Sequence, residues 1–214
     1  EGSGSAILIE NSNAYFTVST SNLSNSEAHA LEGGIKIQNS QNANLIGNNC
    51  SFNGGNGILI IESSKINISY GEYNNNSLNG IKITESSDII IQSVQSSNNT
   101  YGVQINSSDH IGIYQSNATR NNIGIRIINS NHTQIIGNNS VSFNTEKGIA
   151  LFSSNNCTID DNMHTIDSNT MGIYLNNSHQ NNITLNSITN HEYGIYLDSS
   201  NSNRIEENSL MGNT

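Results

Sequence analysis

Glycine recurs along this chain at intervals of 22 to 24 residues. The eight glycines of this periodic column are Gly34, Gly57, Gly80, Gly102, Gly124, Gly148, Gly172 and Gly194. An aliphatic residue stands one, three and eleven positions after each of them, and a serine stands six positions after. Because these four columns hold without exception over eight repeats, the chain is built from one short structural unit that is repeated in space.

Each repeat alternates apolar and polar residues in the manner of short β-strands. Gly-Ile-x-Ile begins a first strand, the serine ends it, and the aliphatic residue at position eleven lies in a second. A third, looser strand is expected to carry Phe52, Tyr73, Val94, Ala118, Val141 or Phe143, Ile166, Ile188 and Leu210. One such unit cannot bury its apolar side alone, but units stacked about 4.8 Å apart bury a continuous core and pair their backbones in parallel sheets.

This pattern predicts an all-β fold, a single-stranded β-solenoid of about 8–9 coils of 22–24 residues with three short parallel sheets. Residues 1–214 are expected to form one domain. Residues 34–214 are regular coils, and 1–33 are an irregular first coil with an insertion at Ser19–Glu32. The repeat stops after Thr214, where another Gly-Ile-x-Ile is due. We therefore expect a fragment, a module of a longer array, or a unit that stacks end to end.

The composition indicates how the turns are made. The chain contains 41 Asn and 33 Ser but no Pro, which would remove a donor from the strand ladders. Asn tolerates the left-handed backbone conformation of tight turns, and the glycines suit positions of positive φ or close backbone approach. One Asn column stands fourteen positions after the glycine, at Asn48, Asn138, Asn162, Asn186 and Asn208. Stacked in register, its amides are expected to hydrogen-bond from coil to coil.

The repeat resembles a known family. The pattern N-x-[IL]-x-x-N-x-x-G-I-x-[IL]-x-x-S, seen in Asn186–Ser200 with His191 in place of the second Asn, is similar to the NosD-type, or carbohydrate-binding and sugar hydrolase (CASH), repeats. The resemblance covers about Gly34 to Asn213 and implies a right-handed parallel β-helix of the pectin-lyase-like class. That class includes lyases, glycosidases, epimerases, copper-site assembly factors, adhesins and surface-layer proteins, so the function stays open.

The net charge and the short loops disfavour two classes of function, nucleic-acid binding and catalysis. The net charge of −10 disfavours a nucleic-acid partner, and no apolar run is long enough to form a transmembrane segment. The loops between strands are uniformly short, which leaves no cleft to orient a substrate. We therefore expect a non-catalytic extracellular or cell-surface solenoid that serves a structural, sheath, filament or adhesion role. Its partner is itself, by end-to-end or lateral assembly, or a surface glycan, and no cofactor is expected. The alternative is a carbohydrate-binding or carbohydrate-active β-helix similar to polysaccharide lyases or glycosidases.

The strongest catalytic candidates are three acidic residues and one histidine. They are Asp160, Asp161, His164 and Glu206. Asp160 and Glu206 share a column two coils apart, so roughly 10 Å separates their backbones, near the upper end for the paired carboxylates of inverting glycosidases. Solvated acids on an acidic protein are the favoured interpretation.

His110 and His132 are the candidate metal ligands. They occupy the same position in adjacent coils, about 5 Å apart, with Asp88 one coil earlier. Imidazole nitrogens bind transition metals, and the resemblance to NosD-type proteins suggests copper. Exposed turn residues without a metal are the favoured interpretation.

Tyr174 and Tyr196 are the candidate glycan contacts. They face outward in one column of the first sheet, in which Lys36, Lys82 and Arg126 precede them. Aromatic faces with polar neighbours suit a sugar ring, and cross-strand aromatic packing is the alternative.

The remaining residues considered are the two cysteines and the asparagines of possible N-glycosylation sites. Cys50 and Cys157 lie five coils apart, too far for a disulfide, and are interpreted as buried side chains. Glycosylation candidates, which would matter only after export, are Asn22, Asn67, Asn75, Asn98, Asn106, Asn117, Asn131, Asn176 and Asn182.

Overall fold

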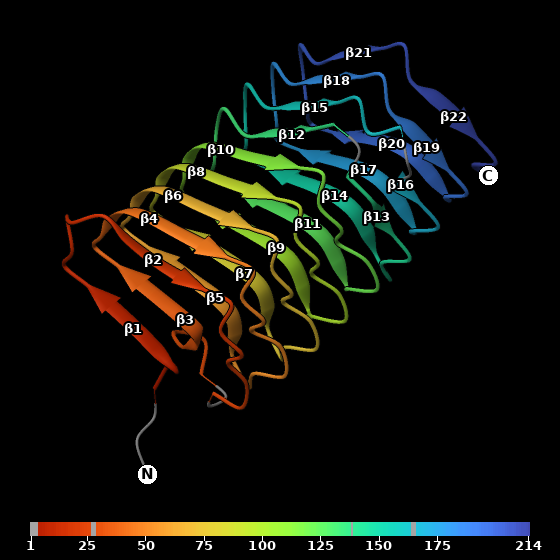
Figure 1. Ribbon diagram of the computed structural model, residues 1–214. Helices are drawn as coiled ribbons and strands as arrows, with labels where there is room; N and C mark the ends of the chain where they lie inside the picture. Colours follow the sequence, from red (N-terminus) through yellow and green to blue (C-terminus); the bar gives the residue numbers. More distant parts are fainter. Residues whose placement is uncertain (1–3, 27–28, 138, 164–165) are drawn as a thin grey trace.

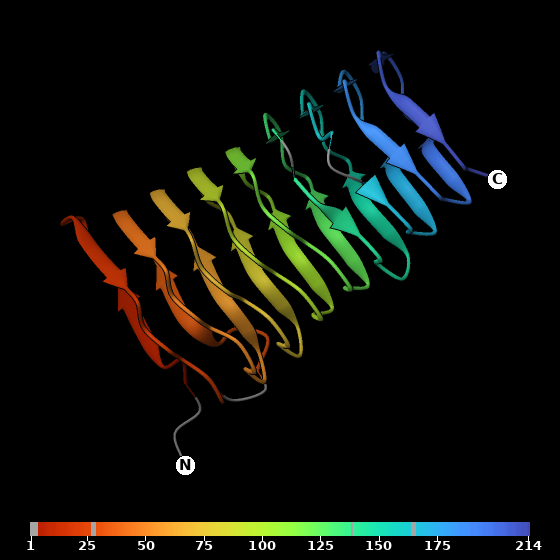
Figure 2. The same ribbon diagram turned by 45° about the vertical axis from the view of Figure 1, so that its right-hand side comes forward.

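The chain winds into one continuous stack of β-coils. The computed structural model describes residues 4–26, 29–137, 139–163 and 166–214, and these form strands and turns without any helix. Figure 1 shows the coils rising in chain order, and Figure 2 shows the first coil (red) and the last coil (blue) at opposite ends of the stack. The predicted all-β solenoid with three parallel sheets is confirmed.

Two nine-stranded parallel sheets run the length of the stack. The first sheet contains β1 (Ile7–Glu10), β3 (Gly33–Gln38), β5 (Asn56–Ile61), β7 (Asn79–Thr84), β9 (Tyr101–Asn106), β11 (Ile123–Ile128), β14 (Lys147–Phe152), β17 (Met171–Asn176) and β20 (Tyr193–Asp198). The second sheet contains β2 (Phe16–Ser19), β4 (Gln41–Ile46), β6 (Ser64–Ser69), β8 (Ser87–Gln92), β10 (Asp109–Tyr114), β12 (Gln134–Ile136), β15 (Thr158–Asp160), β18 (Asn182–Thr184) and β21 (Arg204–Glu206). Each strand pairs with its counterpart one coil away.

The third sheet is shorter than the sequence predicts. It contains four strands, β13 (Val141–Ser142), β16 (Ile166–Asp167), β19 (Ser187–Thr189) and β22 (Ser209–Met211). In earlier coils single bridges such as Asn49 to Glu72 take its place. The assignment of Phe52 to this strand is wrong, because Phe52 is 62% exposed and has a φ of 60°, whereas Cys50 supplies the buried side chain. A left-handed residue turns its side chain out of the strand, and the sequence pattern alone does not reveal that.

Aliphatic side chains from all three sheets fill the interior. In register pairs such as Ile58 with Ile81 and Ile60 with Ile83, aliphatic side chains of the same kind stack on each other. Each aliphatic column therefore runs without interruption through the core. Cys50 and Cys157 are buried and free, and burial raises the pKa of Cys50 to about 12 and that of Cys157 to about 11. Both thiols are therefore protonated, unreactive core side chains.

The repeated glycine is required by close backbone approach rather than by a positive φ. A Cβ on Gly57 would lie 2.5 Å from the carbonyl oxygen of Gly80, and one on Gly148 would lie 2.6 Å from that of Gly172. The glycines with positive φ are Gly47, Gly137 and Gly212, which lie outside this column. A side chain in the column would therefore force neighbouring coils apart.

The insertion before the first regular coil is tied to the stack. Leu23 packs against the core, and the backbone N–H of Glu32 donates to the carbonyl oxygen of His29 in a turn.

The predicted Asn column forms a hydrogen-bonded ladder. The backbone N–H of Asn162 donates to Oδ1 of Asn186 at 3.3 Å, and that of Asn186 donates to Oδ1 of Asn208 at 3.0 Å. The Asn186 amide also donates to the carbonyl oxygen of Ile159 at 2.8 Å. The member before Asn162 is Asn139, whereas Asn138 lies outside the described residues. The ladder satisfies buried turn amides that would otherwise have no partner.

Two more ladders close the other turns. The serine column repeats one bond in every coil, in which the backbone N–H of one serine donates to Oγ of the next, as from Ser40 to Ser63 at 3.1 Å. A second Asn column, which is the second Asn of the repeat pattern before the glycine, consists of Asn53, Asn76, Asn99, Asn121, Asn144, Asn169, His191 and Asn213. His191 replaces an Asn here: its Nδ1 accepts from the N–H of Asn169 while Nε2 donates to the carbonyl oxygen of Ile166.

The ladder predicts a measurable loss of stability in Asn186→Ala. The substitution leaves the buried N–H of Asn162 and the carbonyl oxygen of Ile159 without these side-chain partners, which costs about 1–3 kcal/mol of unfolding free energy. Urea denaturation followed by circular dichroism measures the change. Asn201→Ala, at an exposed turn position, is the control and should change stability by less than about 0.5 kcal/mol. Equal stability of the two variants would contradict the role of the ladder.

Candidate functional sites on the outer faces

Aromatic rings follow the stack axis on the outer face of the first sheet. Tyr174 and Tyr196 are register partners in β17 and β20, and their rings stack with centroids 5.6 Å apart and planes at 24°. Phe152 meets Tyr174 edge-on at 5.7 Å, and Tyr193 lies 5.4 Å from Tyr196. The two tyrosines thus lie together as their shared column requires, and glycan contact by them stays a prediction.

Cations are interleaved with these rings. The guanidinium of Arg126 lies 4.9 Å from the centroid of the Tyr101 ring and 5.3 Å from that of Phe152. Nζ of Lys147 lies 5.2 Å from the Tyr174 centroid. Each contact of this kind contributes about 0.5–2 kcal/mol, so the rings hold the cations against the sheet. Sequence reasoning missed the rings of Tyr101 and Phe152, which stand in neighbouring columns.

This face is locally positive on an acidic molecule. The first-sheet strands from β3 to β17 contain four of the seven Lys and Arg residues and no Asp or Glu. These cations are Lys36, Lys82, Arg126 and Lys147. Glu32 and Glu146, which pair with two of them at 3.8 and 3.5 Å, lie just outside the strands. We call these four cations with Tyr101, Phe152, Tyr174 and Tyr196 the cation–aromatic strip.

An imidazole–carboxylate cluster lies where strand β10 begins. His110 and His132 stack with ring centroids 4.9 Å apart and planes at 20°. Oδ2 of Asp109 lies 2.8 Å from Nδ1 of His110, and Oδ1 lies 2.9 Å from Nδ1 of His132. Burial works against a charge on Asp109, but the hydrogen bond from His132 and the nearby imidazoles outweigh it, so the pKa of this carboxyl lies below its ordinary value. Among the described residues, these three are the one group whose potential metal-binding atoms converge.

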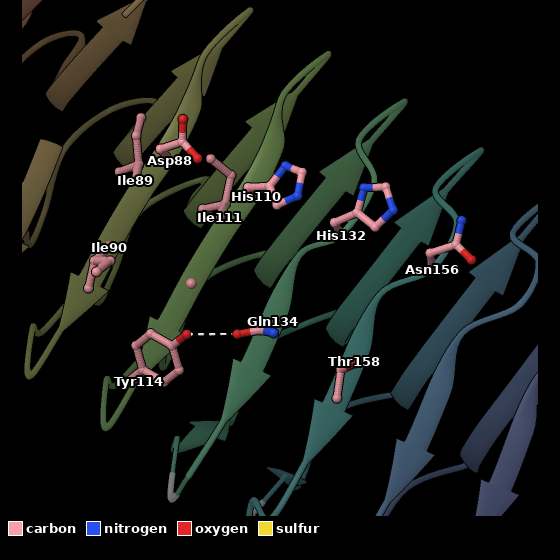
Figure 3. A pocket seen from close by; sticks show the side chains of 11 residues that line it. Asp88, Ile89, Ile90, His110, Ile111, Tyr114, His132, Gln134, Asn156 and Thr158 are labelled. Carbon is pink, nitrogen blue, oxygen red and sulfur yellow. Dashed lines mark hydrogen bonds between the residues drawn. The ribbon is translucent and has the colours of Figure 1, made fainter. Parts of the chain in front are cut away.

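The cluster borders a cavity of about 470 Å³ on the second sheet (Figure 3). Gly112 has no side chain, and the Tyr114 ring lies over it. The hydroxyl of Tyr114 donates a hydrogen bond to Oε1 of Gln134 at 2.9 Å. Asp88, the expected companion of the histidines, lines the cavity one coil earlier. The carboxylate that contacts both rings is Asp109, which sequence reasoning missed although it directly precedes His110.

The acidic catalytic candidates are engaged with their neighbours. Asp160 and Glu206 lie in register across Thr184, as their shared column predicts. Thr184 Oγ1 donates to Oδ1 of Asp160. Arg204 lies 2.6 Å from Glu206, and its hydrogen bond lowers the pKa of that carboxyl. These contacts favour structural roles for both carboxylates.

Asp161 and His164 are the other two members of this set. Asp161 occupies a turn with a φ of 53°, and its backbone N–H donates to the carbonyl oxygen of Thr184. His164 lies outside the described residues. A catalytic role for the set stays a prediction.

The glycosylation candidates divide by exposure. The exposed ones are Asn22, Asn75, Asn98 and Asn117. The half-buried ones are Asn67, Asn106, Asn131, Asn176 and Asn182. Asn176 donates a hydrogen bond to Asp198 at 2.8 Å, so its amide is already engaged. If the chain is glycosylated, the exposed set offers the accessible amides.

Comparison with known proteins places the chain in a family. The family described as periplasmic copper-binding protein (NosD) matches residues 70–214, which is more than half of the chain. The chain belongs to the NosD family. No match was found among curated proteins. In the described part of this NosD-family chain, no helix is long and apolar enough to cross a membrane.

Solved structures share the fold at low sequence identity. The periplasmic alginate epimerase AlgG is 20% identical with a TM-score of 0.74 over 83% of this chain and 47% of its own. The A-module of the Azotobacter vinelandii mannuronan C-5 epimerase AlgE4 is 12% identical, with a TM-score of 0.63 over 94% and 58%. The Streptococcus pneumoniae surface protein and adhesin PfbA is 11% identical, with a TM-score of 0.59 over 97% and 67%. The NosD-family chain spans about half the length of the epimerases, and the likeness shows the fold alone.

A charged hydrogen-bond network at Asp167 predicts pH-dependent stability. Burial disfavours its charge, but hydrogen bonds from Asn190, Thr189 and Ser168 outweigh this and hold the pKa of the carboxyl below its ordinary value. Because the unfolded value of about 3.9 is higher, the stabilisation is present above about pH 4 and is lost as the pH falls through the folded pKa.

Asp167→Asn is therefore expected to lower the unfolding free energy by about 1 kcal/mol at neutral pH and by less near pH 3. Urea denaturation at several pH values measures this difference. Glu85→Gln, at an exposed turn, is the control. A difference between wild type and Asp167→Asn that does not change with pH would contradict the prediction.

Proposed function

We propose that this NosD-family chain is a non-catalytic carbohydrate-binding β-helix of the cell envelope. We propose further that its ligand is an acidic polysaccharide lying along the outer face of the first sheet. The cation–aromatic strip carries this proposal. The family description places its members in the periplasm, and the structural neighbours include a periplasmic epimerase and a surface adhesin, which supports an envelope location.

The strip offers the two kinds of contact that an acidic sugar needs. Aromatic faces pack against the apolar face of a sugar ring, and Tyr196 is 41% exposed in a position to do so. Lys and Arg donate charge-assisted hydrogen bonds to carboxylate or sulfate groups. Because Arg126 and Lys147 are already held by rings, they lose little further freedom when a ligand binds.

The geometry of the strip suits a polymer. Parallel strands repeat about every 4.8 Å, so equivalent outward positions recur at a constant spacing along the axis. Lys36, Lys82 and Arg126 stand at every second coil of one such line, and Tyr174 and Tyr196 follow them, so a chain of sugar units parallel to the axis meets cations and then aromatic faces. The net charge of −10 on the whole molecule opposes a polyanion, so binding is expected to be moderate and to weaken with added salt.

The short turns favour binding over catalysis. From Gly34 on, successive coils differ in length by at most two residues, so long loops do not build walls around the strip. An open face exchanges water freely and does not isolate reacting groups. Self-assembly of the solenoid, end to end or side by side, stays a separate prediction of the sequence.

Loss of the paired rings should weaken polysaccharide binding. We expect Tyr174→Ala with Tyr196→Ala to reduce affinity for a polyuronate at least about tenfold, since stacking contributes roughly 1–2 kcal/mol. Isothermal titration calorimetry with alginate or polygalacturonate measures the affinity, and neutral dextran is the comparison ligand. The control is Tyr15→Ala, which removes a ring that is 68% exposed and lies outside the strip. Preference for dextran, or unchanged affinity in the double variant, would overturn the proposal.

The same polysaccharides should remain intact. Prolonged incubation is expected to release no reducing ends, no unsaturated uronates and no epimerised units, as judged by chromatography and NMR. Products that appear with the wild type and vanish in Asp160→Asn or Asp161→Asn would show that the protein is an enzyme and that these acids are catalytic.

A further inference from the structure

We propose that Asp109, His110 and His132 form a binding site for a first-row divalent transition-metal ion of the Cu²⁺ and Zn²⁺ class. The site lies on the second sheet and is independent of the polysaccharide proposed for the first.

The fold itself places the two histidines. They stand in a column whose residues all have left-handed backbones, with φ of 52° at His110 and 48° at His132, and the same holds for Asp88 and Asn156 on either side. A residue in this conformation turns its side chain out of the strand. Because the coils stack in register, the imidazoles are held at a centroid distance of 4.9 Å without any dedicated loop.

Asp109 brings a carboxylate to both rings. It pairs with Asn131 of the next coil in a parallel bridge, which keeps it level with the two histidines. Its oxygens lie 2.8 and 2.9 Å from the two Nδ1 atoms, and potential ligand atoms of all three residues lie within 4.8 Å of one another. Adjacent ligands on an ion with bonds of about 2.0–2.1 Å are separated by about 3 Å, so a modest side-chain adjustment suffices.

The donor types select the class of ion. Two imidazole nitrogens and one carboxylate oxygen suit Cu²⁺, Ni²⁺ and Zn²⁺, whereas Ca²⁺ and Mg²⁺ require oxygen ligands. A neutral imidazole coordinates through one nitrogen and keeps its proton on the other, so a neutral ring loses no proton on binding. The adjoining cavity leaves space for water in the remaining coordination positions. The family description as copper-binding agrees with this donor set.

The test titrates the full chain with Cu²⁺ or Zn²⁺ alone in isothermal titration calorimetry. We expect one saturable site, no comparable site for Ca²⁺, and at least a tenfold loss of affinity in both His110→Ala and His132→Ala. Asp109→Asn should also bind more weakly, because the neutral amide is a poorer ligand. The matched control is His29→Ala, which removes another exposed imidazole and should leave the affinity unchanged.

Spectroscopy separates this site from incidental binding. Electron paramagnetic resonance of the Cu²⁺ complex should show two coupled nitrogens in the wild type and fewer in each cluster-histidine variant, while circular dichroism confirms that the variants are folded. Absence of saturable binding, or equal affinity in the wild type and His110→Ala with His132→Ala, would overturn the proposal. Polyuronate affinity measured on the same variants should be unchanged, so failure of one proposal leaves the other intact.

Discussion

The structure depends on exact vertical register between coils. Strand ladders satisfy the backbone in the sheets, but three turns per coil also bring N–H groups into the interior, where an unpaired donor costs about 1–3 kcal/mol. Ser and Asn side chains resolve this by accepting bonds from the coil before them, as Ser63 does for Ser40 and Asn186 does for Asn162. Since every bond spans one coil, a slip of one residue would break all three ladders together.

This constraint confines function to the outward columns. The inward positions are occupied by aliphatic side chains and the turn positions by ladder residues, so binding groups have only the outer faces available. Stacking in register turns each outward position into a line of side chains parallel to the axis. The cation–aromatic strip and the Asp109 cluster are two consequences of the same rule, one on the first sheet and one at the edge of the second.

Much of the fold follows from one-dimensional spacing, because each coil contacts only its neighbours. Coil length, the core columns and the first Asn ladder could be predicted in this way, and the pairing of Ile58 with Ile81 is a direct example. The third sheet could not, since it depends on whether a short segment is extended or left-handed. Phe52 shows the difference: it fits the apolar pattern, yet its φ of 60° turns it outward.

The sequence by itself determined the repeat, the core and which residues share a column, since these need only constant spacing and alternation. It therefore placed Tyr174 beside Tyr196 and His110 beside His132. Only the tertiary structure decided which side chains of different columns contact one another. Asp109 reaches both imidazoles, and Arg126 lies between Tyr101 and Phe152, because side-chain directions depend on local backbone angles and on packing across coils. Those contacts between columns, rather than the columns themselves, create the candidate sites.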